Sequence, residues 1–169
     1  MAVIFSDKFE KAVDYVIKNE GGYVFDKDDL GGETKFGISK RSYPALNIKD
    51  LTLENAKKIY FCDYWYKGRF EEIEDESVAT QLFDLSVNMG IRSAVIVLQR
   101  ALRSVGIRVQ EDGLIGSETL SAVKKSEPRC LLAAIKSEAA GYYRMLAQCK
   151  TGQEKFLKGW LNRAYKQII

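Results

Sequence analysis

The chain has 169 residues, of which 46% are hydrophobic and only two are proline, as expected for one folded domain or a core with a small added region. Its net charge of +3 is too small to indicate nucleic-acid binding. The sequence contains no histidine, which excludes serine–histidine and cysteine–histidine nucleophiles and histidine-bound zinc. Proton transfer must therefore come from carboxylates, lysine or tyrosine, and we expect neither a metal nor a cofactor.

The sequence contains no apolar run long enough to span a membrane, so stable membrane insertion is not expected. The first residues lack the basic and apolar regions of a signal peptide, which predicts a cytoplasmic protein as synthesised. The three cysteines lack C-x-x-C spacing. We expect them to be buried small apolar residues.

The first predicted helix follows Ser6, a suitable N-cap, and ends at Gly21–Gly22. Its apolar residues recur with helical spacing at Phe9, Ala12, Val13, Val16 and Ile17. Residues 23–39 contain two short apolar stretches separated by aspartates and glycines, a pattern typical of a β-hairpin.

The rest of the chain is predicted to be helical. Periodicity and caps indicate helices over residues 53–67, 75–90, 93–106, 117–125, 128–149 and 154–165. The helix over 93–106 is apolar on most sides and is expected to be the central buried helix. A boundary near Gly90 divides the chain into regions 1–90 and 91–169, the second packed on the first or forming one compact domain with it.

Glu20 has an unusual orientation for a residue at a helix end. At about 100° per residue, Glu20 lies within about 20° of Phe9 around the helix axis, whereas Lys18 and Asn19 point away. Partial burial there disfavours the charged carboxylate, as a general acid working near neutral pH requires. The alternative is a solvated carboxylate at a capped helix end.

The loop after this helix supplies candidates for a second carboxylate, namely Asp26, Asp28 and Asp29. A hairpin would fold them back toward Glu20, and paired carboxylates are the arrangement used for glycoside hydrolysis. Thr34 is a candidate to orient a water molecule. A calcium loop is the alternative, but the loop lacks the 12-residue pattern with a closing glutamate.

The stretch EGGYVFDKDDLGGETKFGIS (residues 20–39) resembles the signature of glycoside hydrolase family 108. The pattern is E-G-G-Y, an Asp-rich turn and then G-G-x-T-[KN]-[YF]-G-I. These are lysozyme-like muramidases of phage, prophage and bacterial genomes, and some are labelled secretion activators. Three later segments resemble the family's peptidoglycan-binding region, so the resemblance covers nearly the whole chain: LFDLSVNMGIRSAVIVLQRAL (82–102), EDGLIGSETLSAV (111–123) and FLKGWLNRA (156–164).

The resemblance implies a mainly α, lysozyme-like fold with a small β-hairpin after the first helix. It implies a catalytic region over 1–90, a peptidoglycan-binding region over 91–169, and Glu20 as the catalytic acid. The implied substrate is the peptidoglycan glycan strand, cut at the β-1,4 bond between N-acetylmuramic acid and N-acetylglucosamine.

The order Glu, Asp, Thr is also similar to the E-x8-D-x5-T motif of small phage lysozymes. The spacing from Glu20 to Asp29 fits this motif, but only four residues separate Asp29 from Thr34. The second carboxylate is therefore Asp29 by spacing, with Asp26 as the alternative.

Three further residues are candidates for substrate binding. Tyr23 and Phe36 are predicted to line the cleft, the alternative being packing within the hairpin. Lysozyme-like folds often bring an amide such as that of Asn88 to the N-acetyl group, although an asparagine before a glycine also ends helices.

We therefore predict a peptidoglycan hydrolase that uses general-acid catalysis by a carboxylate. A lytic transglycosylase and a non-catalytic wall-binding or secretion-accessory protein are the alternatives. The resemblance to prophage enzymes implies that the protein reaches the wall after lysis or through a holin-type export partner.

Overall fold

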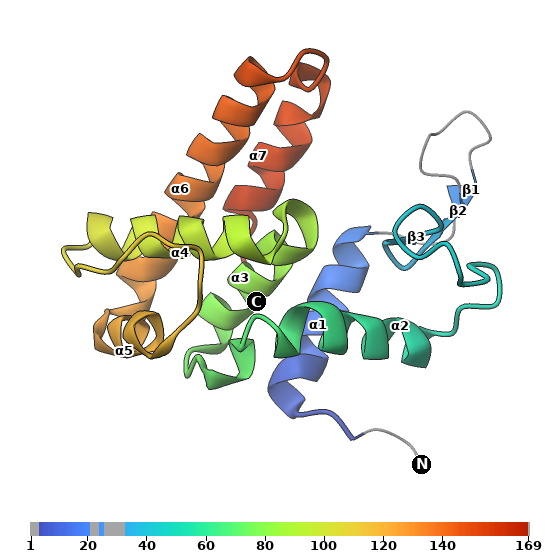
Figure 1. The fold of residues 1–169 in the computed structure, drawn as a ribbon, viewed down its shortest axis with the longest axis horizontal. Helices are drawn as coiled ribbons and strands as arrows, with labels where there is room; N and C mark the ends of the chain where they lie inside the picture. Colours follow the sequence, from blue (N-terminus) through green and yellow to red (C-terminus); the bar gives the residue numbers. More distant parts are fainter. Residues whose placement is uncertain (1–3, 21–23, 26–32, 169) are drawn as a thin grey trace.

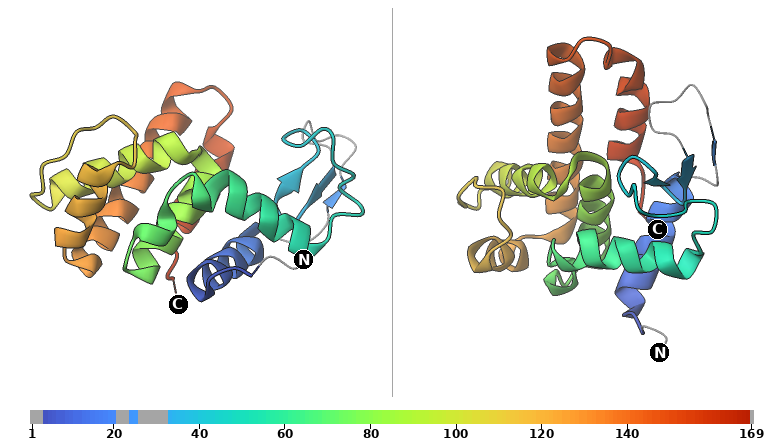
Figure 2. Two further views of the ribbon diagram at one scale, coloured as in Figure 1. Left: turned by 60° about the horizontal axis from the view of Figure 1, so that its bottom comes forward. Right: turned by 45° about the vertical axis from the view of Figure 1, so that its right-hand side comes forward.

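The computed structural model describes residues 4–20, 24–25 and 33–168 of the chain. Helices make up most of these residues, and a small sheet lies at one side (Figure 1). The last turn of the first helix, α1, lies between the sheet and a hairpin formed by the last two helices, α6 and α7 (Figures 1 and 2). The end of α1 is therefore flanked by the sheet on one side and by the α6–α7 hairpin on the other.

Helix α1 spans Asp7–Glu20, as predicted. Ser6 begins the helix, because its Oγ accepts a hydrogen bond from the backbone N–H of Phe9 at 3.2 Å. The predicted apolar face is confirmed, since its residues are fully buried: Phe9, Ala12, Val13 and Val16. The phenyl ring of Phe9 contacts four other aromatic rings: Phe5, Phe61, Trp65 and Phe83.

The sheet contains three short antiparallel strands in the order β1 (Val24–Phe25), β2 (Glu33–Lys35) and β3 (Ile38–Ser39). The predicted hairpin is present, but its second strand was expected over residues 35–38, where the structure has a turn between β2 and β3. Phe36 and Gly37 join β2 to β3 with φ angles of +54° and +78°. Two positive φ angles in a two-residue connection are typical of the turns that join twisted antiparallel strands.

Helix α2 spans Leu53–Tyr60 and continues as a π-helix, η1 (Phe61–Tyr66). The Thr52 Oγ1 caps α2 by accepting from the backbone N–H of Asn55 at 3.2 Å. A short 3₁₀ helix, η2 (Phe70–Glu72), leads to α3. The predicted helix over 53–67 therefore has the right position, but its second half has wider turns than an α-helix.

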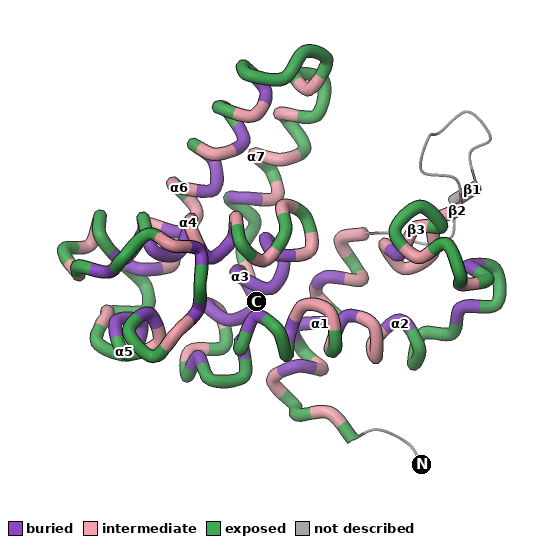
Figure 3. The backbone as a smooth tube through the Cα atoms, viewed as in Figure 1, coloured by how far each residue is buried: buried purple, intermediate pink, exposed green. Residues whose placement is uncertain are grey.

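The remaining helices form the centre and the far side of the molecule. They are α3 (Glu76–Met89), α4 (Ile91–Ser104), α5 (Ser117–Lys125), α6 (Pro128–Cys149), η3 (Glu154–Phe156) and α7 (Leu157–Tyr165). Every residue of α3 from Val78 to Ser86 is buried, whereas α4 has one exposed face (Figure 3). The expectation of a central helix over 93–106 that is apolar on most sides is therefore wrong as to burial, because α4 keeps an exposed face, whereas α1, α4 and α6 pack around α3.

One continuous apolar core extends from Phe9 in α1 to Ala164 in α7. The three cysteines are exposed, which corrects the expectation that they are buried. Within the described residues, no helix is long and apolar enough to cross a membrane.

The backbone of the β2–β3 turn lies so close to α1 and α2 that a side chain would not fit at Gly37. A Cβ atom added to Gly37 would lie 2.5 Å from the Tyr60 hydroxyl and 2.7 Å from Cγ of Glu20. The Tyr60 hydroxyl donates a 2.8 Å hydrogen bond to the Phe36 carbonyl in the same turn. The sheet is thus joined to both helices through a glycine next to Glu20.

Replacing Gly37 with alanine should destabilise the protein for two reasons. The left-handed backbone costs about 1–2 kcal/mol for a residue with a Cβ atom, and overpacking against Tyr60 and Glu20 adds about 1–3 kcal/mol. Urea denaturation followed by circular dichroism measures the loss. Gly152→Ala is the matched control, because Gly152 has a φ of +83° and no atom within 4 Å of the added Cβ. An equal loss in the two variants would contradict the close approach at Gly37.

Candidate active site

Glu20, the last residue of α1, lines a cavity of about 150 Å³ between the sheet and the helices. Its side chain is 22% exposed, so the carboxylate is partly desolvated but still accessible. The cavity is lined by Glu20, Gly37, Ile38, Ser42, Tyr43, Tyr60, Tyr64, Val87 and Asn88. The first helix, the sheet, α2 and its π-helical extension, and the end of α3 all contribute to this wall.

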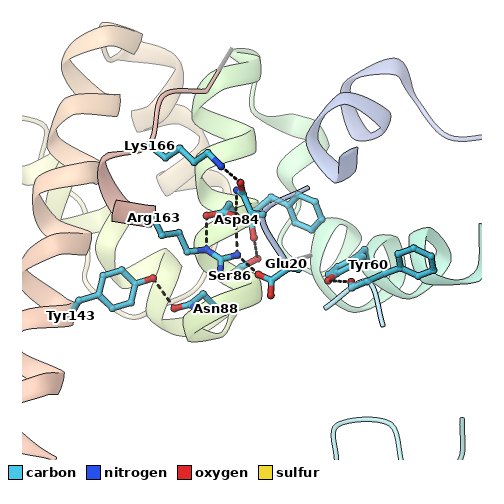
Figure 4. A network of polar contacts seen from close by, with 11 residues as sticks. Glu20, Tyr60, Asp84, Ser86, Asn88, Tyr143, Arg163 and Lys166 are labelled. Atoms are coloured by element: carbon cyan, nitrogen blue, oxygen red, sulfur yellow. Dashed lines mark hydrogen bonds and ion pairs between the residues drawn. The ribbon is translucent and has the colours of Figure 1, made fainter. Parts of the chain in front are cut away.

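Arg163 of α7 contacts Glu20 directly. The Nη2 atom of Arg163 donates to Oε1 of Glu20 at 2.5 Å (Figure 4). The same guanidinium binds Asp84 of α3 in bidentate fashion, with Nε 2.8 Å from Oδ2 and Nη2 2.9 Å from Oδ1. One cation is therefore shared by two carboxylates from different helices.

Burial and charge act in opposite directions on this cluster. The Asp84 side chain is fully buried, and that of Arg163 is 16% exposed. Burial alone would lower the pKa of Arg163, but the hydrogen bonds and negative charges of Asp84 and Glu20 raise it above its usual value. Arg163 is therefore charged at every pH at which the protein is folded.

The last turn of α1 is held by a second polar contact. The Nδ2 atom of Asn19 donates to Oδ1 of Asp84 at 3.3 Å, and its Oδ1 accepts from Nζ of Lys166. Asn19 points away from the apolar stripe, as predicted, but its side chain is engaged in polar contacts. Helical periodicity places Asn19 off the apolar stripe, but α3 and the end of α7 cover that side of the helix.

Three tyrosines give the cavity a neutral, amphipathic wall. Burial raises the pKa of Tyr43, Tyr60 and Tyr64 above the ordinary tyrosine value, so their hydroxyls stay protonated near neutral pH. The Tyr43 hydroxyl donates to Oδ2 of Asp63 at 2.8 Å. Aromatic faces and neutral hydroxyls together suit a ligand with both apolar faces and hydroxyl groups.

Asn88 lies on the opposite side of the cavity, near the end of α3. Its Oδ1 accepts a 2.8 Å hydrogen bond from the hydroxyl of Tyr143 in α6, whose ring stacks on Trp160 of α7 at 5.4 Å. Oδ1 is engaged, and no described residue bonds to the amide NH₂ group, which can therefore donate to a ligand carbonyl.

The other predicted site residues have different positions. Thr34 lies in β2 opposite Val24 and Ser39, and Phe36 packs against the core with Lys35 Nζ 5.6 Å from its ring centroid. Neither lines the cavity around Glu20, so their functional roles stay predictions. Tyr23, Asp26 and Asp29, which were also predicted to act in the site, lie outside the described residues. The second carboxylate therefore stays a prediction from spacing.

Arg163 and Asp84 are the residues of this cluster that sequence reasoning missed. Asp84 had a detectable signal, because it is a lone carboxylate within the apolar run LFDLSV, and a buried charge needs a partner. Arg163 had no such signal, because its helix also carries the exposed cation Lys158.

Comparison with known proteins gives two family matches. Residues 13–90 match the family described as Glycosyl hydrolase 108, and residues 93–165 match the family described as Predicted Peptidoglycan domain. Glu20 and Asp84 lie in the first match and Arg163 in the second, so the ion-pair cluster joins the two matched regions. No curated protein matches the chain.

Among solved structures, the chain is similar to one described as the structure of Brucella abortus SagA. The two share 29% sequence identity with a TM-score of 0.75, over 92% of this chain and 88% of that chain. This likeness supports the predicted lysozyme-like, mainly α fold. The chain therefore carries a glycosyl hydrolase 108 region followed by a peptidoglycan domain, and together these identify it as a peptidoglycan hydrolase.

Proposed function

We propose that this peptidoglycan hydrolase is an N-acetylmuramidase with Glu20 as its general acid. It cleaves the β-1,4 bond between N-acetylmuramic acid and N-acetylglucosamine in glycan strands. The observation that carries the proposal is that Glu20 is the one acidic side chain among the described residues lining the cavity. It is partly buried there, beside tyrosines and an amide.

In this mechanism the protonated Glu20 gives its proton to the glycosidic oxygen as the bond from that oxygen to the anomeric carbon breaks. The sugar passes through an oxocarbenium-like state, and a water molecule adds to the anomeric carbon to leave a reducing end. The proton released by the water restores the acid. Asp29, with Asp26 as the alternative, is proposed to position this water or to stabilise the positive charge, and Thr34 to orient the water.

The cavity wall supports recognition of an N-acetylated sugar. The free NH₂ group of Asn88 is proposed to donate to the carbonyl of an N-acetyl group, since Tyr143 occupies its oxygen. The hydroxyls of Tyr60 and Tyr64 are neutral, so they can bind sugar hydroxyls without the desolvation cost of a charge. Release to the wall, with a holin-type partner, is a proposal that rests on the sequence resemblance.

Replacing Glu20 with glutamine should reduce the lysis of purified peptidoglycan by about 100-fold or more, because the amide cannot supply the acid proton. Loss of turbidity and zymography measure the activity. Circular dichroism should show an unchanged fold, since the amide oxygen still accepts from Arg163. Glu118→Gln, at an exposed position in α5, is the control and should keep wild-type activity.

Full activity of the Glu20→Gln variant would overturn the assignment of the acid. A wild-type protein that binds wall sacculi without releasing soluble fragments would instead be a binding protein, and the enzymatic proposal would fail.

The products of digestion distinguish hydrolysis from the lytic transglycosylase reaction. Hydrolysis adds water and should give muramic acid residues with reducing ends. In a transglycosylase, a hydroxyl of the substrate itself attacks, which gives anhydro-muramic ends. Mass spectrometry of borohydride-treated fragments should show reduction at muramic acid, and anhydro ends as the main product would overturn the hydrolytic mechanism.

A further inference from the structure

We propose that Arg163 is a positioning residue for the acid Glu20, and that Asp84 balances the charge of Arg163 so that Glu20 can hold a proton. This inference rests on the proposed function of Glu20. It assigns a role in catalysis to α7, which belongs to the region matched as a peptidoglycan domain.

The geometry of the cluster favours positioning. Arg163 uses two nitrogens for Asp84 and shares one of them with Oε1 of Glu20. To the residues that the structure describes, Oε2 of Glu20 makes no hydrogen bond. The guanidinium therefore fixes one oxygen of the carboxyl group and leaves the other for the substrate. The planar guanidinium, with its N–H donors in fixed directions, holds two carboxylates in this way better than a lysine ammonium does.

A purely structural role does not account for the contact with Glu20. Asp84 alone supplies the bidentate partner and the negative charge that a buried guanidinium needs. Glu20, in contrast, is the last residue of α1, where the helix dipole is unfavourable for a carboxylate. A cation at this point holds the carboxyl group against the end of the helix.

The charge balance explains why two carboxylates face one cation. If Arg163 faced Glu20 alone, its charge would keep Glu20 ionised and unable to act as an acid. Because Asp84 is fully buried and bidentate, it compensates that charge. Protonation of Glu20 then leaves a neutral Arg163–Asp84 pair instead of an uncompensated buried cation.

The other titratable groups around the cluster are neutral or are bound elsewhere. Lys166 lies beside the cluster but is bonded to Asn19. Burial raises the pKa of the neighbouring tyrosines, which therefore stay neutral where the enzyme works: Tyr15, Tyr60, Tyr64 and Tyr143. Among the described residues, Arg163 and Asp84 are thus the charged groups bonded to Glu20 or to its partner.

The test measures kcat and KM on soluble glycan fragments as a function of pH. Arg163→Met should lower kcat by about 10–100-fold with little change in KM, because the acid is misplaced while the sugar contacts remain. Arg163→Lys should recover part of this loss. Arg144→Met is the matched control, because Arg144 is exposed on the neighbouring helix α6, and it should behave as wild type.

Asp84→Asn tests the charge balance. A general acid is active while protonated, so activity falls as pH rises through its ionisation. An uncompensated Arg163 favours the ionised form, and the alkaline limb of the pH profile should move to lower pH by on the order of one unit. A merely structural role for Asp84 would lower the amount of folded enzyme without moving this limb.

The double variant Arg163→Met, Asp84→Asn guards against misfolding, because it removes both charges and leaves neither buried alone. It should keep the kcat loss of Arg163→Met without the acid shift of Asp84→Asn. Wild-type kcat in folded Arg163→Met and in the double variant, together with an unmoved alkaline limb in folded Asp84→Asn, would overturn the proposal. If Glu20→Gln is inactive in the same assay, only the positioning role has failed, whereas an active Glu20→Gln would overturn the proposed function and this inference with it.

Discussion

The buried ion pair between Arg163 and Asp84 is the constraint on which the arrangement of this site depends. Taking a guanidinium out of water costs several kcal/mol, so Arg163 is tolerated at this depth only with a bidentate partner. Asp84 is that partner, and it lies in the fully buried part of α3. The pair therefore ties α7 to α3, while the stack of Trp160 on Tyr143 packs α7 on α6. A residue 79 positions away from Asp84 in the chain thus reaches the carboxylate of Glu20.

Glu20 is held from two sides as a result. Arg163 binds its carboxyl group from α7, while the turn at Gly37 packs against its aliphatic part from the sheet. The hydrogen bond from Tyr60 to the Phe36 carbonyl fixes that turn on α2. Such support from separate elements is what a reacting group needs, because its geometry must be set before the substrate arrives.

Local sequence signals predicted most helices of this structure but not the ion-pair cluster around Glu20. Periodicity and caps located α1 and α6, and helix geometry aimed Glu20 toward the core, because these properties depend on neighbours within a few residues. Asp84 and Arg163 meet only in the folded chain, and so no local pattern pairs them. The same reason explains the choice of α4 as the central helix: its composition is apolar, but α3 is the helix that the others surround. Periodicity placed Asn19 off the apolar stripe but could not predict that Asp84 and Lys166 bind it there.

The two matched regions meet at one ion-pair cluster beside the proposed active site. The first region holds Glu20 and Asp84, whose like charges oppose each other across a partly dry space. The second region contributes the cation that makes this pair of carboxylates tolerable, and Tyr143 orients the Asn88 amide from the same side. An appended binding module would contact the catalytic region through its surface. Here the contact is made by Arg163, a buried charge that bonds directly to Glu20 and Asp84 of the first region.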